Sequence, residues 1–340
     1  MQDRQHSWGE RHQVTLNDVA KAAGTSQSAA SVVLNDARSG TRVSPERRRA
    51  VLEAAQRLGY RPNALARSLT TGRTHRIGVY SGRSRLDSRN SFYAELLGGV
   101  LVAAGEFRYN TMIHSSGWDL DGLLDLVSNR ALDALIVHAA GDDKIIPLLG
   151  ELRVPAVAVA DPIDNLPTVV VDDAKGGELQ AYHLASLGHR HVLVKQCGNL
   201  VHSANIRMAS FIQTAEQLGI EVSKRYETFD EDYGLDRSDI HALSFGPDRA
   251  TAVVGWSDDV AHRVCDHLDK LGFSVPKDVA VVGFDGMVHS FTPRHVLTTI
   301  RAPWAKVGST AVSLLHALIE GESIPALTIL PVEFVLGATT

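Results

Sequence analysis

The sequence predicts a small all-α N-terminal domain followed by a larger α/β body. Three observations lead to this prediction: an uneven distribution of charge, closely spaced helix signals before residue 60, and short apolar runs that alternate with helical patterns after residue 76. At 340 residues the chain is long enough for two or three compact units. Hydrophobic residues make up 44% and charged residues 21%, a composition typical of globular rather than disordered proteins.

Charge divides the chain at Arg76. Of the 34 Lys and Arg residues and the 39 Asp and Glu residues, residues 1–76 hold 13 and 6, a net charge of +7. The remainder holds 21 and 33, a net charge of −12. Because Lys and Arg release condensed counterions from phosphates, a basic head beside an acidic body suggests that the head binds a polyanion.

The first helix is predicted to begin at Leu16. The hydroxyl group of Thr15 can cap it, and Asp18 stands three positions further on, as in a capping box. Its apolar positions have the spacing of one buried helix face; they are Leu16, Val19, Ala20 and Ala23. Gly24 then permits the left-handed backbone that ends a helix within a short turn.

A second helix is predicted from Gln27 to about Leu34, with Ser26 as its N-cap. The positions left available to a partner are Gln27, Ser28, Ser31 and Val32. Two helices joined in this way form the unit that places its second helix in the major groove of DNA. Ser44-Pro45 and Gly59 mark the start and the end of a third short helix.

Four segments carry a family pattern in order: VTLNDVAKAAGTS at 14–26, SVVLN at 31–35, VSP at 43–45 and LGYRPNALARSL at 58–69. Together they resemble the lactose-repressor (LacI/GalR) family of bacterial transcription regulators. The resemblance implies a helix-turn-helix DNA-binding domain over residues 14–60, a hinge helix and linker over 61–76, and a two-lobed effector-binding and dimerisation domain over 77–340. It also implies a homodimer on near-palindromic operator DNA, because one head contacts few bases.

The resemblance implies which residues contact DNA. We expect Gln27 and Ser28 to hydrogen-bond base edges, and Val32, where many relatives have Arg, to offer only an apolar contact. Leu69 matches the leucine that the hinge helix wedges into the minor groove. The full predicted set is Thr15, Ser26, Gln27, Ser28, Ser31, Val32, Asn35, Arg42, Asn63, Ala66 and Leu69. Ser26, Ser31, Asn35 and Arg42 are expected to contact phosphates. The alternative, for these four residues and for Gln27 and Ser28, is that some are only solvent-exposed polar residues.

The body contains seven short apolar runs, each bounded by polar residues, Gly or Pro. They are residues 77–80, 111–114, 134–137, 156–159, 191–195, 252–255 and 279–284. Their alternation with helical patterns predicts parallel sheets covered by helices on both faces, in which ligands bind at the carboxyl ends of the strands. The order of elements resembles the periplasmic sugar-binding fold, whose two lobes close on a small molecule.

The resemblance also implies an effector pocket between the lobes. Arg207 matches an arginine that grips the effector, since its planar fork can hold a carboxylate or two hydroxyl groups. Asp285 matches an aspartate that accepts hydrogen bonds from ligand hydroxyls. The predicted pocket residues are Phe92, Tyr93, Asp161, Arg207, Ser257 and Asp285. The alternative for each is a structural salt bridge or a capped loop. Ser257 and Gly286 depart from the Asn and Asp usual in the family, which leaves the effector's identity open. Residues 81–89 form a longer and more basic loop than usual; either one of its arginines reaches the cleft toward an acidic effector, or the loop is solvated.

Other classes of function find little support in the sequence. Cys197 and Cys265 stand far apart, so no disulfide framework or zinc site is indicated, and the histidine pair at 189 and 191 matches a family turn. No catalytic or cofactor motif is recognised, and we expect neither an enzyme nor a cofactor. No apolar run is long enough for a membrane helix and no signal core precedes the head, so we expect a cytoplasmic, nucleoid-associated protein.

The leading hypothesis is therefore a transcription repressor controlled by a sugar or a sugar-like metabolite. A second hypothesis keeps the DNA-binding role but gives the body a protein partner or no effector, because Ser257 and Gly286 are unusual. A third, from another class, is a solute-binding transport protein with the same two-lobed fold; it would need an export signal and would have no use for residues 14–71.

Overall fold

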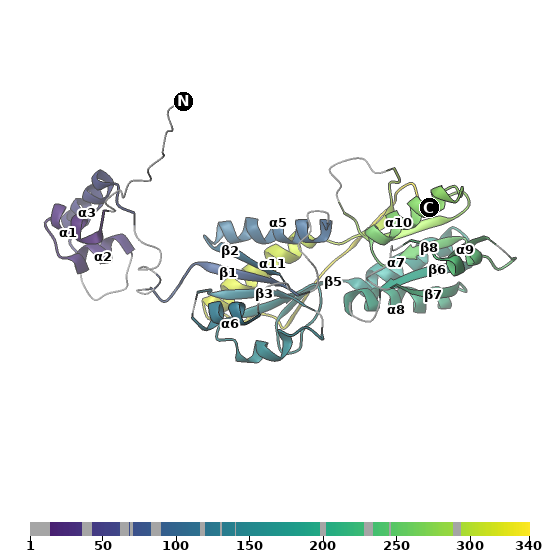
Figure 1. Cartoon of the computed structure of the whole chain (residues 1–340), viewed down its shortest axis with the longest axis horizontal. Coiled ribbons are helices and arrows are strands. Elements are labelled where there is room, and N and C mark those ends of the chain that lie inside the picture. Colours follow the sequence, from purple (N-terminus) through teal and green to yellow (C-terminus); the bar gives the residue numbers. More distant parts are fainter. Residues whose placement is uncertain are drawn as a thin grey trace, which may run out of the picture. The chain divides into compact units, whose positions relative to one another are not determined.

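The computed structural model describes residues 14–35, 43–61, 68, 71–82, 90–115, 120–129, 131–139, 141–197, 202–227, 234–244, 246–287 and 294–340. The chain divides into two compact units, residues 1–75 and 76–340 (Figure 1). We call them the head and the body.

The head packs three helices, α1 (Leu16–Ala22), α2 (Gln27–Asn35) and α3 (Pro45–Leu58), around one small core. The predicted capping box is present, since the backbone N–H of Asp18 donates to the Thr15 hydroxyl and that of Thr15 to the Asp18 carboxylate. Gly24 and Gly59 adopt the left-handed backbone that ends α1 and α3. The fully or nearly buried residues of the core are Val19, Ala20, Ala30, Val33, Val51, Ala54 and Ala55.

The first lobe of the body is built on a six-stranded parallel sheet. Its strand order is β11 (Leu327–Leu330), β5 (Thr168–Val171), β4 (Ala156–Val159), β3 (Ala134–His138), β1 (Arg76–Ser81) and β2 (Asn110–Ser115). Helices α5 (Ser91–Glu106) and α11 (Trp304–Ile319) cover one face, and α6 (Leu120–Ser128) with the short helix η1 (Ile146–Glu151) covers the other.

The second lobe repeats this plan. Its strand order is β12 (Glu333–Val335), β10 (Thr298–Arg301), β9 (Ala280–Asp285), β8 (Ala252–Gly255), β6 (His191–Cys197) and β7 (Glu221–Glu227), and only β12 runs antiparallel to its neighbour. Helices α7 (Asp173–Ser186) and α8 (His202–Gln217) cover one face. Helices α9 (Arg237–Ser244) and α10 (Asp258–Lys270) cover the other.

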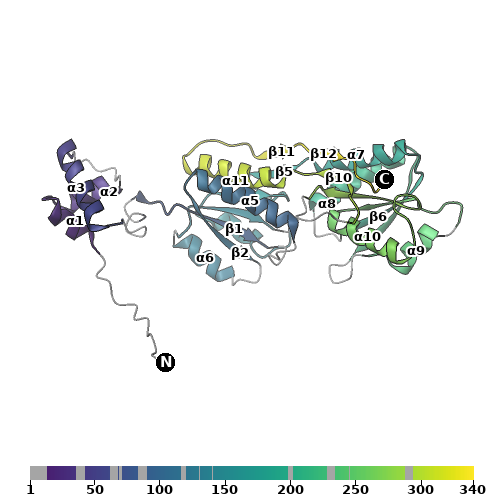
Figure 2. The ribbon, with the colours of Figure 1, turned by 90° about the horizontal axis from the view of Figure 1, so that it is seen from above.

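The two lobes share an apolar joint. Phe284 and Ile300 belong to strands of the second sheet, yet they pack in the same buried cluster as Leu96 of α5 and Trp304 of α11. The C-terminal segment, yellow in Figure 2, continues from α11 of the first lobe through β11 and on to β12 of the second. The connection between the lobes is therefore made of several chain crossings and a common core.

The predicted fold class is confirmed, and all seven predicted strands are present with small changes at their ends. The described residues contain five further strands, β5, β7, β10, β11 and β12. Strands β7, β11 and β12 lie at the edges of their sheets and carry mixed polar and apolar residues, so they lack the apolar runs that mark buried parallel strands. Strands β5 and β10 are four residues long, as are the predicted strands β4 and β8, so length alone does not explain why they were missed.

Candidate functional site

The exposed face of α2 is formed by its first turn. Gln27 and Ser28 are exposed, whereas Ser31 and Val32 are half-buried. The Ser26 hydroxyl accepts a hydrogen bond from the N–H of Ala29 at 3.2 Å and lies 3.0 Å from the Ser28 hydroxyl. Gln27 and Ser28, the residues predicted to contact bases, are therefore the exposed ones of the four predicted contact positions in α2. They directly follow Ser26, whose side chain caps the helix.

Several predicted DNA contacts cannot be located. Arg42, Asn63, Ala66 and Leu69 lie outside the described residues, as do residues 83–89 of the basic loop, and the side chain of Asn35 is not described. Thr15 is described, but its hydroxyl group donates to the Asp18 carboxylate at 2.7 Å. It therefore serves the start of α1 in the structure, and its contact with DNA stays a prediction.

In the body, polar residues gather where the strands of both sheets end. On the first lobe, the Ser81 hydroxyl at the end of β1 donates to the Tyr93 hydroxyl at 2.6 Å. The Tyr93 hydroxyl in turn hydrogen-bonds to Nδ1 of His138, the last residue of β3. The carboxylate of Asp161, just after β4, lies 3.7 Å from Nε2 of His138.

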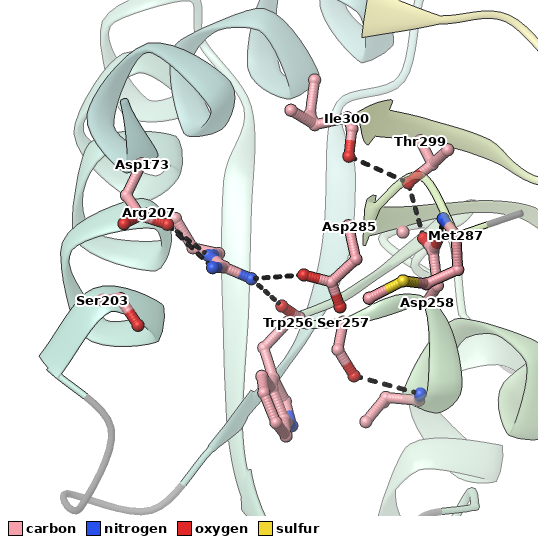
Figure 3. Close-up of polar contacts among 12 residues, drawn as sticks. Asp173, Ser203, Arg207, Trp256, Ser257, Asp258, Asp285, Met287, Thr299 and Ile300 are labelled. Carbon is pink, nitrogen blue, oxygen red and sulfur yellow. Dashed lines mark hydrogen bonds and ion pairs between the residues drawn. The ribbon is translucent and has the colours of Figure 1, made fainter. Parts of the chain in front are cut away.

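On the second lobe, Arg207 of α8 is the centre of a buried polar cluster (Figure 3). Its Nε and Nη2 lie 3.0 and 2.8 Å from one carboxylate oxygen of Asp173, at the start of α7. Its Nη1 donates to the carbonyl oxygen of Trp256 at 2.8 Å and lies 3.8 Å from the Asp285 carboxylate. The guanidinium carbon stands 3.5 Å above the ring centre of Phe284.

Asp285 holds an unusual backbone position at the end of β9. Its φ of 126° lies in the region that favours glycine, so a side chain there is strained. Strain of this kind persists only where the surrounding structure imposes it, and it concentrates at binding sites. The carboxylate keeps a small exposed fraction beside Arg207, which leaves it accessible to a ligand.

Burial raises the pKa of both carboxyl groups beside Arg207. The pKa of Asp173 rises to about 6, chiefly through loss of hydration, although the Arg207 charge and hydrogen bonds oppose this. The pKa of Asp285 rises to about 8 by burial, with Arg207 again opposing and Asp258 adding repulsion. One guanidinium therefore does not offset the cost of burying both carboxyl groups, and near pH 7 Asp285 favours its protonated form, in which it can donate as well as accept a hydrogen bond.

Asp258 and Ser257, at the start of α10, have structural partners. Asp258 accepts hydrogen bonds from the Thr299 hydroxyl and from the backbone N–H of Met287 at 3.1 Å. The Ser257 hydroxyl accepts from the N–H of Val260 at 3.4 Å and so caps the helix. Ser257 is thus the N-cap of α10, and its contact with an effector stays a prediction.

Gly286 has a structural reason to lack a side chain. Its φ of +65° is left-handed, and a Cβ atom there would lie 2.4 Å from the Cα of Arg301. The aspartate usual in the family at this position would overlap the backbone of β10. The departure seen in the sequence therefore reflects close packing of two strands at the joint between the lobes.

A hydrogen bond links the first lobe to the second where the ends of their sheets face each other. The carboxylate of Asp161 accepts a hydrogen bond from the backbone N–H of Ser203, in the first turn of α8, at 2.9 Å. Asp161 thus belongs to the first lobe and holds the start of a helix in the second. Phe92 packs edge-on against Trp304 and is half-buried, whereas Tyr93 is buried and directs its hydroxyl inward.

The structure brings the six predicted pocket residues to the facing ends of the two sheets. Asp285 and Arg207 of the second lobe are in contact with each other, whereas Phe92, Tyr93 and Asp161 belong to the first lobe. Sequence reasoning missed His138, Asp173, Ser203 and Trp256. His138 directly follows the predicted strand 134–137, so its place at a strand end was a usable signal; nothing local marked Asp173 as the partner of Arg207.

Histidine and cysteine residues elsewhere have ordinary surroundings. Nδ1 of His189 hydrogen-bonds to the Thr251 hydroxyl at 2.8 Å, and Cys265 is fully buried, which raises its pKa to about 12. Within the described parts of the chain, no group of three or more His, Cys, Asp or Glu side chains could hold a metal ion. None of the described helices is long and apolar enough to cross a membrane.

The fold and the site together define a two-lobed ligand-binding body joined to a helix-turn-helix head. Comparison with known proteins agrees with this class. Residues 15–63 match the profile of bacterial regulatory proteins of the lacI family, and residues 181–340 match the periplasmic binding protein-like domain. The chain belongs to the lacI family, and it is a DNA-binding transcription regulator.

Relatives and solved structures share nearly the whole chain. Catabolite control protein A of Priestia megaterium is 28% identical over 321 residues, 92% of this chain and 94% of its own. The transcriptional repressor PurR of Escherichia coli is 30% identical over 316 residues, 88% and 89%. The lac repressor dimer bound to operator and an anti-inducer aligns with a TM-score of 0.78 at 24% identity, covering 96% and 99%. The complex of the regulator CelR with cellobiose gives 0.68 at 25%, covering 96% and 100%.

Proposed function

We propose that the protein is a repressor that binds operator DNA as a homodimer and is controlled by a sugar or a sugar-like metabolite held between the lobes of the body. The observation that carries the effector part is the buried cluster in which the Asp285 carboxylate stands on a strained backbone beside Arg207. A carboxyl group that can donate or accept, next to the oriented donors of a guanidinium, suits the hydroxyl groups of a sugar. The solved CelR relative holds cellobiose, which supports this class of ligand.

For DNA recognition we propose three functional parts: residues 14–60 read the operator, residues 61–76 form the hinge and linker, and residues 77–340 bind the effector and the second subunit. Gln27 and Ser28 contact base edges from the exposed first turn of α2, and Val32 makes an apolar contact. Phosphate and hinge contacts are proposed for the remaining residues of the predicted set, namely Thr15, Ser26, Ser31, Asn35, Arg42, Asn63, Ala66 and Leu69.

The surface proposed for the second subunit lies on the first lobe. Leu101 and Val102 of α5 are 52% and 67% exposed, and Ile113 on the edge strand β2 is 40% exposed. Large apolar side chains exposed on one lobe are suited to an interface, and a second copy would cover them. A dimer also doubles the number of bases and phosphates that the heads contact. We place this regulator in the cytoplasm on its operator, acting by binding and release without a chemical step.

A thermal-shift screen of the full-length protein with sugars, sugar acids and nucleosides tests the effector. A true effector at ~100 to ~1,000 times its dissociation constant stabilises the body by about 2.7–4.1 kcal/mol. The same ligand must lose this effect on Asp285→Asn and keep it on Asp259→Asn, which changes an exposed carboxylate of α10 that pairs with Arg263. Binding to promoter fragments against random competitor DNA tests the regulator itself.

One observation favours the second hypothesis, a body with a protein partner or no effector. Arg207 already contacts three internal groups: the Asp173 carboxylate, the Trp256 carbonyl and the Asp285 carboxylate. If every metabolite in the screen leaves the melting temperature unchanged while operator binding is specific, this hypothesis replaces the first.

A further inference from the structure

The N–H groups of Arg207 are engaged within the body. Nε and Nη2 lie 3.0 and 2.8 Å from one oxygen of Asp173, and Nη1 donates to the Trp256 carbonyl oxygen at 2.8 Å and lies 3.8 Å from the Asp285 carboxyl group (Figure 3). The Phe284 ring centre lies 3.5 Å from the guanidinium carbon and covers one face of the group. A guanidinium has five N–H groups, so at most one, on Nη2, is left for a ligand.

This arrangement does not suit the binding of an acid group by Arg207. Arginine holds a carboxylate or a phosphate best through two parallel N–H groups on one edge of the guanidinium. The edge formed by Nε and Nη2 already faces Asp173, and Nη1, which the other edge would need, is engaged by the Trp256 carbonyl and by Asp285. One remaining N–H serves a hydroxyl group. Arg207 is therefore an internal counter-ion rather than a binding group for an acidic ligand.

Four carboxyl groups interact electrostatically at the facing ends of the two sheets. Burial is the chief cause of the raised pKa of Asp173, and the neighbouring charge of Asp161 adds to it. Burial likewise raises the pKa of Asp285, and the charges of Asp258 and Asp173 add to it. Asp161 and Asp258 accept hydrogen bonds from backbone N–H groups, as carboxylates do. Even with Asp285 protonated, three carboxylates face the single charge of Arg207.

Other basic side chains near the ends of these strands have partners of their own. The imidazole of His138 lies 3.7 Å from one of the four carboxyl groups and is charged only when it is protonated. Lys195 of β6 pairs at 2.7 Å with Asp239 of α9, which covers the opposite face of the sheet from α8. Arg301, the last residue of β10, lies 3.5 Å from Glu333. The described residues therefore place a net negative charge where the two sheets face each other.

An uncharged donor lies beside Asp285. Trp304, the first residue of α11 in the first lobe, is 2% exposed, and its indole nitrogen makes no hydrogen bond of good geometry with the described residues. It lies close enough to Asp285 to lower the pKa of that residue, against the larger effect of burial. An indole N–H and a carboxyl group that can donate or accept are together suited to the hydroxyl groups of one ligand.

We infer that the effector is a polyhydroxyl compound without an acid group, and that the body rejects sugar acids and sugar phosphates. An added negative charge would meet three buried carboxylates, whereas the one guanidinium is already paired. Hydroxyl groups meet the donors and acceptors that remain. The inference rests on the proposed function, a repressor whose effector binds between the lobes, and narrows its effector to uncharged sugars.

Isothermal titration calorimetry of the full-length protein near pH 7 tests this with matched compounds. Each neutral sugar of the thermal-shift screen is titrated beside its uronic acid, its phosphate ester and the methyl ester of the uronic acid. We expect the neutral sugar and the methyl ester to bind alike, and the acid and the phosphate to bind at least about tenfold more weakly. An acid that binds as tightly as its neutral sugar would overturn the inference. So would a methyl ester that is rejected like the acid, because size rather than charge would then decide.

Two substitutions test the role of the carboxylates. Asp161→Asn keeps an oxygen that can accept the hydrogen bond from α8, and Asp173→Asn keeps one for Arg207, but each removes a negative charge. In either variant the ratio of the dissociation constants of acid and neutral sugar should fall about threefold to tenfold. Asp259→Asn changes an exposed carboxylate that pairs with Arg263 and is the matched control, which should keep the wild-type ratio. An unchanged ratio in Asp161→Asn and Asp173→Asn would overturn the inference.

The outcomes distinguish this inference from the proposed function. Acids that bind while their neutral sugars do not would overturn the inference and leave a repressor with an acidic effector. If no compound of the panel binds while operator binding is specific, the effector itself is refuted, and the inference falls with it. If no promoter fragment is bound specifically, the regulator is refuted, and the ratio of the two dissociation constants still decides the inference.

Discussion

Arg207 makes two contacts with a single carboxylate oxygen of Asp173, from Nε at 3.0 Å and from Nη2 at 2.8 Å, and both side chains are buried. The pair fixes the start of α7 to the first turns of α8, next to the joint between the lobes. A buried ion pair of this kind is costly to break, because the partner that remains is an uncompensated charge.

Arg207→Ala is therefore expected to lower the stability of the body by about 3–5 kcal/mol. The urea-induced unfolding of the full chain, followed by tryptophan fluorescence, measures this. The double variant Arg207→Met with Asp173→Leu should recover much of the loss, since neither charge is left buried. As control, Arg263→Ala removes an exposed pair with Asp259 and should cost less than about 1 kcal/mol. Equal losses for Arg207→Ala and Arg263→Ala would contradict the interpretation.

The two neighbouring glycines of α5 are expected to differ sharply when changed to alanine. A Cβ atom on Gly99 would lie 1.8 Å from the carbonyl oxygen of Ala305 on α11, so Gly99→Ala must push the helices apart and should cost about 1–3 kcal/mol. A Cβ atom on Gly98 meets no atom within 4 Å. Gly98→Ala should therefore be neutral or stabilise by up to about 1 kcal/mol through helix propensity. Melting temperatures that fall by the same amount in both variants would refute the close crossing of α5 and α11.

Stability of the body is expected to fall as the pH rises from about 4 to about 8. The pKa of Asp173 is raised to about 6 and that of Asp285 to about 8, both above the value of an unfolded aspartate. The folded state thus binds more protons than the unfolded state across this range, and the stability gained at low pH is lost as each group ionises. Asp285→Asn should flatten the profile between about pH 6 and about pH 8, whereas Asp259→Asn should leave it unchanged. Chemical unfolding at each pH gives the two profiles.

Gln27→Ala is expected to weaken operator binding in a sequence-dependent way. A good bidentate contact with one base contributes about 1–3 kcal/mol of discrimination, so the loss should vanish on operators altered at that base. Titration of the variant on a panel of operator sequences tests this. A loss of affinity equal for every sequence would remove Gln27 from base recognition and leave it a general DNA contact.

Local signals were enough for the head and for the inner strands of the body. Thr15, Gly24 and Gly59 act where the sequence places them, because caps and left-handed turns depend on a few adjacent residues. The seven predicted strands are apolar because both faces of their sheets are covered. Strand β7 lies at the edge of its sheet and carries Lys224 and Arg225 in its middle. It therefore has no apolar run from which a strand could be predicted.

The site was predictable only in part, because its contacts join residues far apart in the chain. A family pattern leads to Arg207 and Asp285, but neither spacing nor composition reveals that Asp173 holds Arg207 or that Asp161 reaches the N–H of Ser203. Ser257 shows the opposite case. Its position at the start of a helix suffices to explain it as a cap, and the resemblance alone connects it with an effector.

The order of strands in the first sheet constrains when this protein can fold during synthesis. The edge strand β11 pairs with β5, although about 155 residues of chain separate them, and α11 covers α5 across an even longer interval. A ribosome must therefore release almost the entire second lobe before the first can bury its core. Until then the faces of β5 and α5 that β11 and α11 will cover have no partner on the nascent chain, a state in which unpaired strand edges and apolar surface favour aggregation.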